Sequence, residues 1–441
     1  MAMLRGVASA FLWLVLLASA VSILCYLVCT RFNSEIQLDV GHSTQVNIFH
    51  KEYEEQHTRS KVLHGDVVFL KTHKTASSTF QNILFRFGEK NNLTFAFPIQ
   101  GHQFYYPQDF MASYVAMPPR AVGGRFHMLC SHMRFHMAEV ARVMSDNATF
   151  LSIVRSPDTH FESVFHYYEN NDPAFIAAKN HSDRVNKGPF RTFLESAETF
   201  YKRNRKRGPF GRNPMAFDFG LNPNADVSSR EFRSGLAQLD VAFDLVMITE
   251  RFDESVILAK EILGWAMEDV VYLSNNKRAK IHNDKPLERE DTRLTEMIRR
   301  WNALDVALYE HFSRRFQRQV EAFGVGRMRR EVDALRREVS ARREECVASE
   351  VGVHEIKEME MMPYAPESVD ILGFNMKSGL EPRTRERCLR LLLPEPHYHA
   401  RLFRTQRRSW MEKLRYGRII NAGSVAMLSR SPTFALSSIH D

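Results

Sequence analysis

One short stretch combines an apolar run with small and hydroxyl residues around a lysine, and it reads Val67-Val68-Phe69-Leu70-Lys71-Thr72-His73-Lys74-Thr75-Ala76-Ser77-Ser78-Thr79. Its first four residues are apolar, as in a short buried strand. Apolar side chains then return at the spacing of a helix with one buried face, at Phe80, Ile83, Leu84 and Phe87. The sequence therefore predicts a strand, a tight loop and a helix, in that order.

This arrangement suits an anion. A loop that enters a helix directs backbone N–H groups and the positive end of the helix dipole at one point. Lys74 adds a full charge there, and Thr75, Ser77, Ser78 and Thr79 add hydroxyl donors. The same residues also fit an ordinary capped helix after a buried strand, with Lys74 as a surface lysine. The absence of Gly-x4-Gly-Lys-Ser/Thr argues against a Walker-type ATPase.

Three further apolar runs, at residues 126–130, 149–154 and 243–249, are interpreted as strands, and a helical pattern follows each. Alternating strands and helices predict an α/β fold with a central parallel sheet covered by helices on both faces. Ligands of such sheets lie at the carboxyl ends of the strands. Lys74, His132 and Arg155 each follow a strand directly, so we expect them to share one site.

The N-terminus predicts a membrane anchor. Residues 7–30 carry no charged side chain, and at about 1.5 Å per residue they can cross a bilayer core of roughly 30 Å. A cleaved signal peptide is the alternative, because Ala18-Ser19-Ala20 resembles a cleavage motif. Both interpretations place the rest of the chain in the secretory lumen, where Asn92, Asn147 and Asn180 begin glycosylation triplets.

The charge and the cysteines of the chain further limit the functional classes to which the protein can belong. The net charge of +8 suits anionic ligands, but it is too diffuse to indicate nucleic-acid binding, and no zinc finger, RNA-binding motif or basic zipper is visible. Cys346 and Cys388 are expected to pair in an oxidising lumen. A zinc site at His127, Cys130, His132 and His136 is disfavoured, because His-Glu-x-x-His is absent.

Several motifs resemble those of known sulfotransferases. Lys74 to Thr79 resembles the 5′-phosphosulfate loop of enzymes that use 3′-phosphoadenosine 5′-phosphosulfate (PAPS). The longer string from Phe69 to Phe87 resembles the galactose 3-O-sulfotransferase family. Further blocks are similar to that family in the same order, at 131–135, 155–168, 217–220, 252–255, 301–305 and 370–375. The resemblance runs from about residue 62 to residue 400.

The resemblance implies a sulfotransferase fold and a Golgi type II membrane enzyme. Such an enzyme moves sulfate from PAPS to the 3-hydroxyl of a terminal β-galactose on glycoprotein glycans or glycolipid. It needs no metal and no nucleic acid, and it is compatible with a homodimer. Galactosylceramide as the specific acceptor is one alternative; a uronyl 2-O-sulfotransferase and a glycan-binding protein without turnover are others.

The resemblance also suggests residue roles. Lys74, Thr75, Ala76, Ser77, Ser78 and Thr79 would hold the 5′-phosphosulfate, and Arg155 and Ser163 the 3′-phosphate. Lys277 or Arg278, after a strand expected at residues 270–274, would close over the donor. Lys74 would stabilise the leaving phosphate and His132 would take the proton of the acceptor hydroxyl. The residues alone also allow a structural histidine at 132 and a helix-start ion pair at Arg155.

With these roles, the chain divides into segments. They are a cytosolic tail (1–6), the anchor (7–30), a stem (31–62), a sulfotransferase catalytic domain (63–325), a C-terminal helix and appendix (326–400) and a flexible basic tail (401–441). Residues 170–235 lack a regular period and are expected to form an exposed insertion. One long helix is expected from about 288 to 323.

Overall fold

Four parallel strands form the sheet that organises the fold, in the order β2-β1-β3-β4. In the computed structural model these are β1 (Val67–Leu70), β2 (Met128–Leu129), β3 (Thr149–Val154) and β4 (Leu245–Ile248). Leu70 of β1 lies opposite Ser152 of β3, and Val154 of β3 opposite Ile248 of β4. The predicted parallel sheet is confirmed. The structure describes residues 65–117, 124–185, 187–203, 208–274, 277–278, 292–364, 366 and 371–428.

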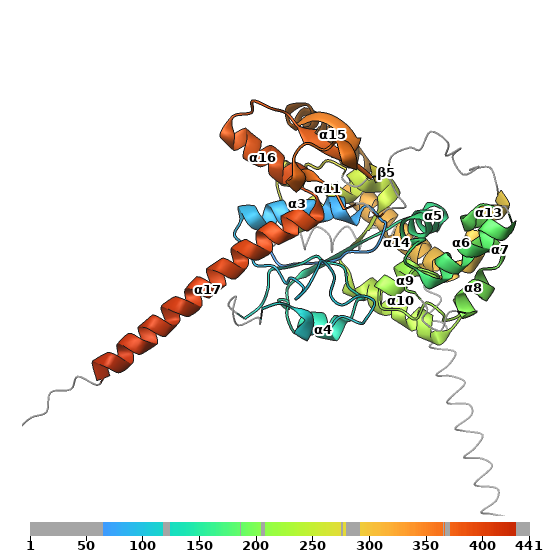
Figure 1. Cartoon of the computed structure of the whole chain (residues 1–441), viewed down its shortest axis with the longest axis horizontal. Helices are drawn as coiled ribbons and strands as arrows, with labels where there is room; N and C mark the ends of the chain where they lie inside the picture. Colours follow the sequence, from blue (N-terminus) through green and yellow to red (C-terminus); the bar gives the residue numbers. More distant parts are fainter. Residues whose placement is uncertain are drawn as a thin grey trace, which may run out of the picture. The chain divides into compact units, whose positions relative to one another are not determined.

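Helices follow each strand and cover the sheet (Figure 1). They are α3 (Ser77–Lys90) after β1, α4 (Met137–Ala141) after β2, α5 (Pro157–Tyr168) after β3, and α11 (Phe252–Leu263) with α12 (Met267–Val270) after β4. Both α11 and α14 (Ala303–Phe323) pack against β4. The strand expected at 270–274 is wrong, because Val270 ends α12 and residues 271–274 form no strand.

The region expected to be an exposed insertion is instead a helical layer with its own core. It contains α6 (Pro173–Val185), α7 (Pro189–Glu195) and α8 (Ala197–Arg203), and α13 (Thr292–Trp301) joins it. Phe165, Phe175 and Phe193 are buried together between these helices and α5. The aromatic residues are spaced irregularly because several short helices share one core, which is why no single period was visible. Two further helices, α9 (Pro214–Asp218) and α10 (Arg230–Ala242), lead to β4.

The long helix expected at 288–323 is two helices that meet at Asn302, a buried residue with non-helical backbone angles. Asn302 accepts a hydrogen bond from the backbone N–H of Asn213 at 2.9 Å. Its side chain therefore serves the loop before α9, and the chain changes direction there. Short 3-10 helices lie at Ala112–Tyr114, Thr249–Arg251, Val353–Glu355 and Met359–Met361.

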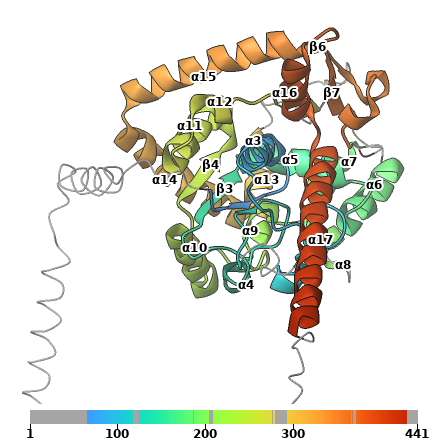
Figure 2. The same ribbon diagram turned by 90° about the vertical axis from the view of Figure 1, so that its left-hand side faces the viewer.

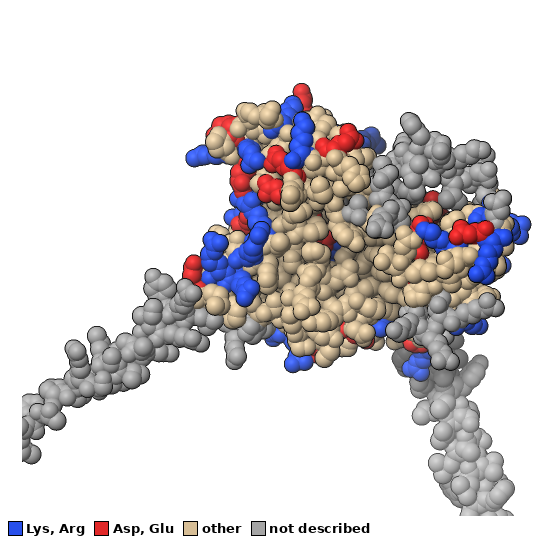
Figure 3. Space-filling model, viewed as in Figure 1, with Lys and Arg blue, Asp and Glu red and all other residues tan. Residues whose placement is uncertain are grey.

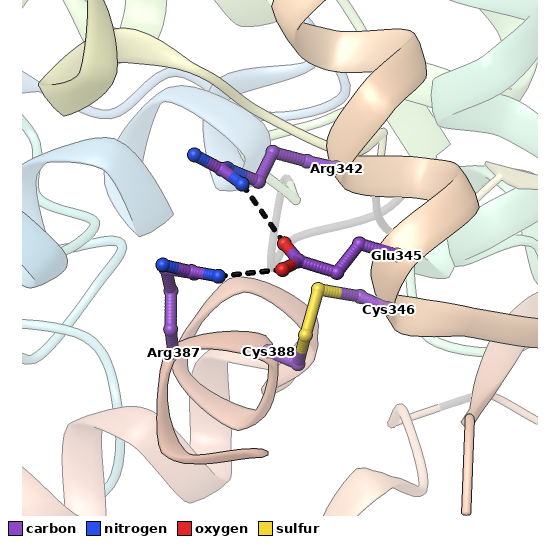
Figure 4. The surroundings of a disulfide bond; sticks show 5 residues. All are labelled: Arg342, Glu345, Cys346, Arg387 and Cys388. Atoms are coloured by element: carbon purple, nitrogen blue, oxygen red, sulfur yellow. Dashed lines mark hydrogen bonds and ion pairs between the residues drawn. A yellow bond between two sulfur atoms is a disulfide. The ribbon is translucent and has the colours of Figure 1, made fainter. Parts of the chain in front are cut away.

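A second, antiparallel sheet lies in the C-terminal part, in the order β5-β7-β6. Its strands are β5 (Lys277–Arg278), β6 (Val347–Gly352) and β7 (Ile371–Met376), accompanied by α15 (Val325–Cys346) and α16 (Pro382–Leu392). The expected disulfide between Cys346 and Cys388 is present, with a Cα–Cα distance of 5.2 Å. It joins the end of α15 to α16 (Figure 4).

The last described element is α17 (Glu395–Leu428), which packs against α3 near its start (Figures 1 and 2). The segment expected to be a flexible basic tail from residue 401 is helical as far as Leu428. Basic side chains gather along this helix (Figure 3), including the exposed Arg404, Arg407 and Arg408. A helix forms here because arginine, glutamine and methionine all have good helix propensity.

The predicted anchor at 7–30, the stem at 31–62 and the end of the tail lie outside the described residues. Among the described helices, none is long and apolar enough to cross a membrane. Asn92, Asn147 and Asn180 are all exposed, so their glycosylation stays a prediction that the structure accommodates.

Candidate active site

The loop after β1 turns sharply because Lys74 and Ala76 adopt the left-handed conformation, with φ of 59° and 63°. Ala76 is the N-cap of α3, and among the described residues no side chain caps that helix end. The first turn of α3 carries no acidic residue either. The Thr79 N–H donates to the Ala76 carbonyl at 3.1 Å. The earlier N–H groups of a first turn have no partners within their own helix, so this loop can offer them to an anion.

Most hydroxyls of the loop are used to hold its shape. Thr75 Oγ1 lies 2.7 Å from Thr72 Oγ1, and Ser77 Oγ donates to the Thr72 carbonyl at 2.6 Å. Ser78 Oγ donates to Glu395 at 3.1 Å, and Thr79 is buried. The expected loop residues are therefore brought together, but contacts to an anion would come from backbone N–H groups more than from hydroxyls.

Lys74 and Arg155 lie next to each other at the carboxyl ends of β1 and β3. The guanidinium of Arg155 donates to the Lys74 carbonyl at 3.2 Å and to Thr159 Oγ1 at 3.0 Å. Lys74 Nζ lies 3.7 Å above the centre of the Tyr167 ring. Burial lowers the pKa of Arg155 from its ordinary value, but an arginine side chain stays protonated in proteins. Two cations therefore adjoin the loop.

His132 follows β2 and reaches the end of β1. Its Nδ1 lies 2.7 Å from the Lys71 carbonyl, so Nδ1 must carry the proton, because a carbonyl only accepts. Its Nε2 lies 2.7 Å from Lys71 Nζ and accepts from that ammonium. Burial, helped by His73 and Lys71, lowers the pKa of His132 well below its ordinary value. The imidazole is therefore neutral, the form that a base requires.

His73 stacks on His132, with ring centres 3.8 Å apart and planes at 9°. Its Nδ1 lies 3.0 Å from Asp218 Oδ2, its backbone N–H donates to the same oxygen at 2.8 Å, and Tyr106 donates to Oδ1 at 2.7 Å. His73 Nε2 is buried, and within the described part of the chain it has no hydrogen-bond partner. A carboxylate thus orients this imidazole and leaves its second nitrogen available, as in catalytic histidine–aspartate pairs.

Lys71 connects these groups to the C-terminal part. It is 1% exposed, and its Nζ lies 3.0 Å from Glu395 Oε2. Although burial opposes ionisation, the Lys71 ammonium lowers the pKa of Glu395 below its ordinary value. A buried line of ionised carboxylate, ammonium and imidazole therefore runs from α17 through Lys71 to His132.

The remaining residues expected at the donor site lie further along the chain. Ser163 is half-buried on α5. Lys277 and Arg278 form β5 and pair with Leu372 and Ile371 of β7. They thus belong to the second sheet. The sequence had instead predicted a loop after a strand at residues 270–274. Their side chains lie outside what the structure describes.

Four residues of this site were not predicted from the sequence: Lys71, His73, Asp218 and Glu395. Lys71 and His73 stand in the opening stretch itself, directly after the apolar run, and that position was the available signal. Asp218 belongs to the block at 217–220 that resembles the galactose 3-O-sulfotransferases. Glu395 gave no signal, because it lies far away in the sequence.

One group of potential metal ligands is close enough to hold an ion among the described residues, formed by Glu345, Cys346 and Cys388. The two sulfurs are bonded to each other. Glu345 accepts from Arg342 at 2.9 Å and from Arg387 at 2.6 Å (Figure 4). This group is therefore a disulfide beside an ion-paired carboxylate.

The chain is similar to known proteins over most of its length. The family model described as galactose-3-O-sulfotransferase matches residues 3–406. The chain is 38% identical over 336 residues to the galactosylceramide sulfotransferase of Mus musculus, covering 76% of this chain and 77% of the relative. It is 38% identical over 353 residues to galactose-3-O-sulfotransferase 3 of Mus musculus, covering 78% and 79%.

A third relative is galactose-3-O-sulfotransferase 2 of Homo sapiens, 37% identical over 349 residues, with 77% of this chain and 83% of the relative covered. The range matched by the family model includes the central sheet, the loop after β1 and the helical layer. The chain is therefore an enzyme of the galactose-3-O-sulfotransferase family.

Proposed function

We propose that the enzyme transfers the sulfuryl group of PAPS to the 3-hydroxyl of a terminal β-galactose on glycoprotein glycans or glycolipid. The observation that carries the proposal is the convergence of three features. They are an uncapped helix start after β1, two adjacent cations and a stacked pair of imidazoles, all at the carboxyl edge of one parallel sheet. Membership of the family supplies the reaction class.

The donor fits this edge by charge. The 5′-phosphosulfate would lie on the N–H groups of α3, with Lys74 beside the bridging oxygen, where negative charge develops as the bond to the phosphate breaks. Arg155 adjoins Lys74 and can give a bidentate contact to the 3′-phosphate, with Ser163 further along α5. We also propose that Lys277 or Arg278 closes over the donor.

One imidazole would take the proton of the acceptor hydroxyl as the new S–O bond forms and the bond to the 5′-phosphate breaks. The products are the galactose sulfate ester and adenosine 3′,5′-bisphosphate. We propose His132 as the base, since its imidazole follows β2 at the end of the sheet and its Nε2 is the unprotonated nitrogen. Lys71 must first release that nitrogen.

A specific observation favours His73 as the second candidate base. Its Nδ1 is fixed by Asp218, and its buried Nε2 has no partner in the described part of the chain. The two assignments differ in a measurable way. With His132 as the base, His132→Gln abolishes transfer and His73→Gln lowers it partially; with His73 as the base, the order is reversed.

The proposed acceptor is a galactose of a glycoprotein glycan or of a glycolipid. The relatives named for galactosylceramide and those named for galactose itself are equally similar, at 37–38% identity, so galactosylceramide is the alternative acceptor. We further propose a Golgi membrane location, with residues 7–30 as a type II anchor and the described part in the lumen. A homodimer is compatible with this arrangement.

The test is sulfate transfer from labelled PAPS by the full-length protein in detergent. Galactosylceramide, a type 1 galactose disaccharide, the mucin-type core disaccharide and desulfated heparan are offered in parallel. Lys74→Ala is expected to abolish transfer to the galactose acceptors. Lys90→Ala is the matched control, because Lys90 ends the same helix and is exposed, paired with Glu268 and Asp269. Normal turnover in a folded Lys74→Ala protein would overturn the mechanism.

A further inference from the structure

The C-terminal helix α17 places a carboxylate in the centre of the transfer site. Glu395 is its first residue, and the side chain is 13% exposed. It lies 3.0 Å from Lys71 Nζ and accepts from Ser78 Oγ at 3.1 Å. Lys71 follows β1 and Ser78 begins α3, so one side chain from the C-terminal part contacts both ends of the loop.

Contacts along α3 hold Glu395 in place. Asn82 of α3 donates to the carbonyl of Arg390 at 3.1 Å, just before Glu395 in the chain. Tyr398, one turn into α17, donates to Glu89 of α3 at 2.8 Å, and Arg401 donates to the same carboxylate at 3.2 Å. The start of α17 is thus docked by buried and charge-assisted hydrogen bonds, and Glu395 has a defined position.

A further contact fixes α17 to the segment before β2. The side chain of Gln406 accepts from the N–H of Phe95 at 2.8 Å and donates to its carbonyl at 2.8 Å. The disulfide between Cys346 and Cys388 adds a covalent link from α16 to α15. The docking of α17 therefore extends beyond the turn that carries Glu395.

The position of Glu395 has a chemical consequence. The Lys71 ammonium has three N–H donors; one points to Glu395 and another to His132 Nε2. With the carboxylate removed, a buried ammonium would lose its charged partner and its fixed direction. Buried charges need such partners, and a flexible lysine side chain without one samples several rotamers.

We propose that Glu395 is a positioning residue of the transfer site, supplied by the C-terminal helix, which holds the Lys71 ammonium when Lys71 releases His132 Nε2 and holds Ser78 at the loop. It acts through Lys71 and Ser78 and touches no reacting atom. This inference rests on the proposed function. It also assigns a role in the transfer site to a part of the chain that the sequence placed outside the catalytic domain.

The experiment measures kcat and KM for PAPS, together with binding of adenosine 3′,5′-bisphosphate, in the full-length protein carrying Glu395→Gln. Loss of a charge-assisted buried hydrogen bond predicts a fall in kcat of about tenfold to hundredfold. KM for PAPS and the affinity for the bisphosphate stay within about threefold, because the loop N–H groups and Arg155 are retained. A general loss of structure would instead weaken donor binding.

Glu395→Asp is the second variant, because it keeps the buried charge and therefore the fold. Its carboxylate is drawn back by about 1.5 Å, the length of one C–C bond, so it cannot reach both Lys71 and Ser78. It is expected to lower kcat at least fivefold. Glu345→Gln is the matched control, an ion-paired carboxylate of the same C-terminal part that contacts Arg342 and Arg387; it should leave kcat unchanged.

The outcomes separate the two proposals. Absence of transfer by the unmodified enzyme would overturn the proposed function. Normal transfer by the unmodified enzyme, with kcat of either Glu395 variant within twofold of it, would overturn the role of Glu395. A loss that appears only in KM for PAPS would also overturn that role, because it would mean that Glu395 serves donor binding instead.

Discussion

Replacing Asp218 by asparagine tests whether the orientation of His73 matters for transfer. The carboxylate accepts from the His73 backbone at 2.8 Å, from His73 Nδ1 at 3.0 Å and from Tyr106 at 2.7 Å. An amide has a single accepting oxygen, and its NH2 group would face donors, so at least one of these bonds is lost. A hydrogen bond to a buried charged group contributes about 1.5–3 kcal/mol.

At about 1.4 kcal/mol per factor of ten, the expected fall in kcat is about 10- to 150-fold. The assay is transfer of labelled sulfate to a terminal β-galactoside at saturating donor and acceptor. Folding is checked by thermal unfolding and by binding of adenosine 3′,5′-bisphosphate. Asp226→Asn is the control, because this aspartate is exposed and its side chain accepts from the nearby Ser228. A folded Asp218→Asn enzyme with kcat within twofold of the unmodified one would refute the reasoning.

Three further predictions concern stability. Burial lowers the pKa of His160 to about 3 and that of His399 to about 4. Below pH 6.5 the unfolded chain therefore binds protons that the folded chain does not, so stability falls as pH drops. The Tm of the unmodified protein should decrease from pH 7 to pH 5, and the Tm of His399→Gln should decrease less steeply. Equal slopes for the two proteins would contradict this prediction. Replacing Cys346 and Cys388 by serine should lower the free energy of unfolding by about 4 kcal/mol, given their sequence separation of 42. Denaturant titration measures this change, and an unchanged free energy would mean that the disulfide does not stabilise the fold. Phe165→Ala, at a fully buried position, should cost about 3–5 kcal/mol in the same titration; a cost below about 1 kcal/mol would mean that the helical layer is not held by its aromatic core.

The central sheet could be predicted because its strands are short, apolar and each followed by a helical pattern. Local signals of this kind also placed Lys74, His132 and Arg155 at strand ends, and the structure brings Lys74 and Arg155 into contact. The disulfide was predictable from the secretory compartment and the small number of cysteines. These inferences depend on nearby residues or on composition, and both are visible in a sequence.

What the sequence could not reveal depends on contacts between distant segments. Glu395 reaches Lys71 across most of the chain, and no periodicity relates them. Asp218, the last residue of α9, orients His73 in the loop after β1. The helical layer was mistaken for an insertion because its aromatic residues form one core only after several short helices have packed. Asn302 ends a helix through a contact with Asn213, which a helical pattern cannot show.

The most direct measurement compares two acceptors with the full-length enzyme and labelled PAPS. One is a terminal β-galactoside and the other is the same glycoside lacking the 3-hydroxyl. We predict that only the first is sulfated and that NMR places the sulfate on its 3-oxygen. Equal sulfation of both acceptors, or sulfate on another oxygen of the galactose, would contradict the proposed reaction.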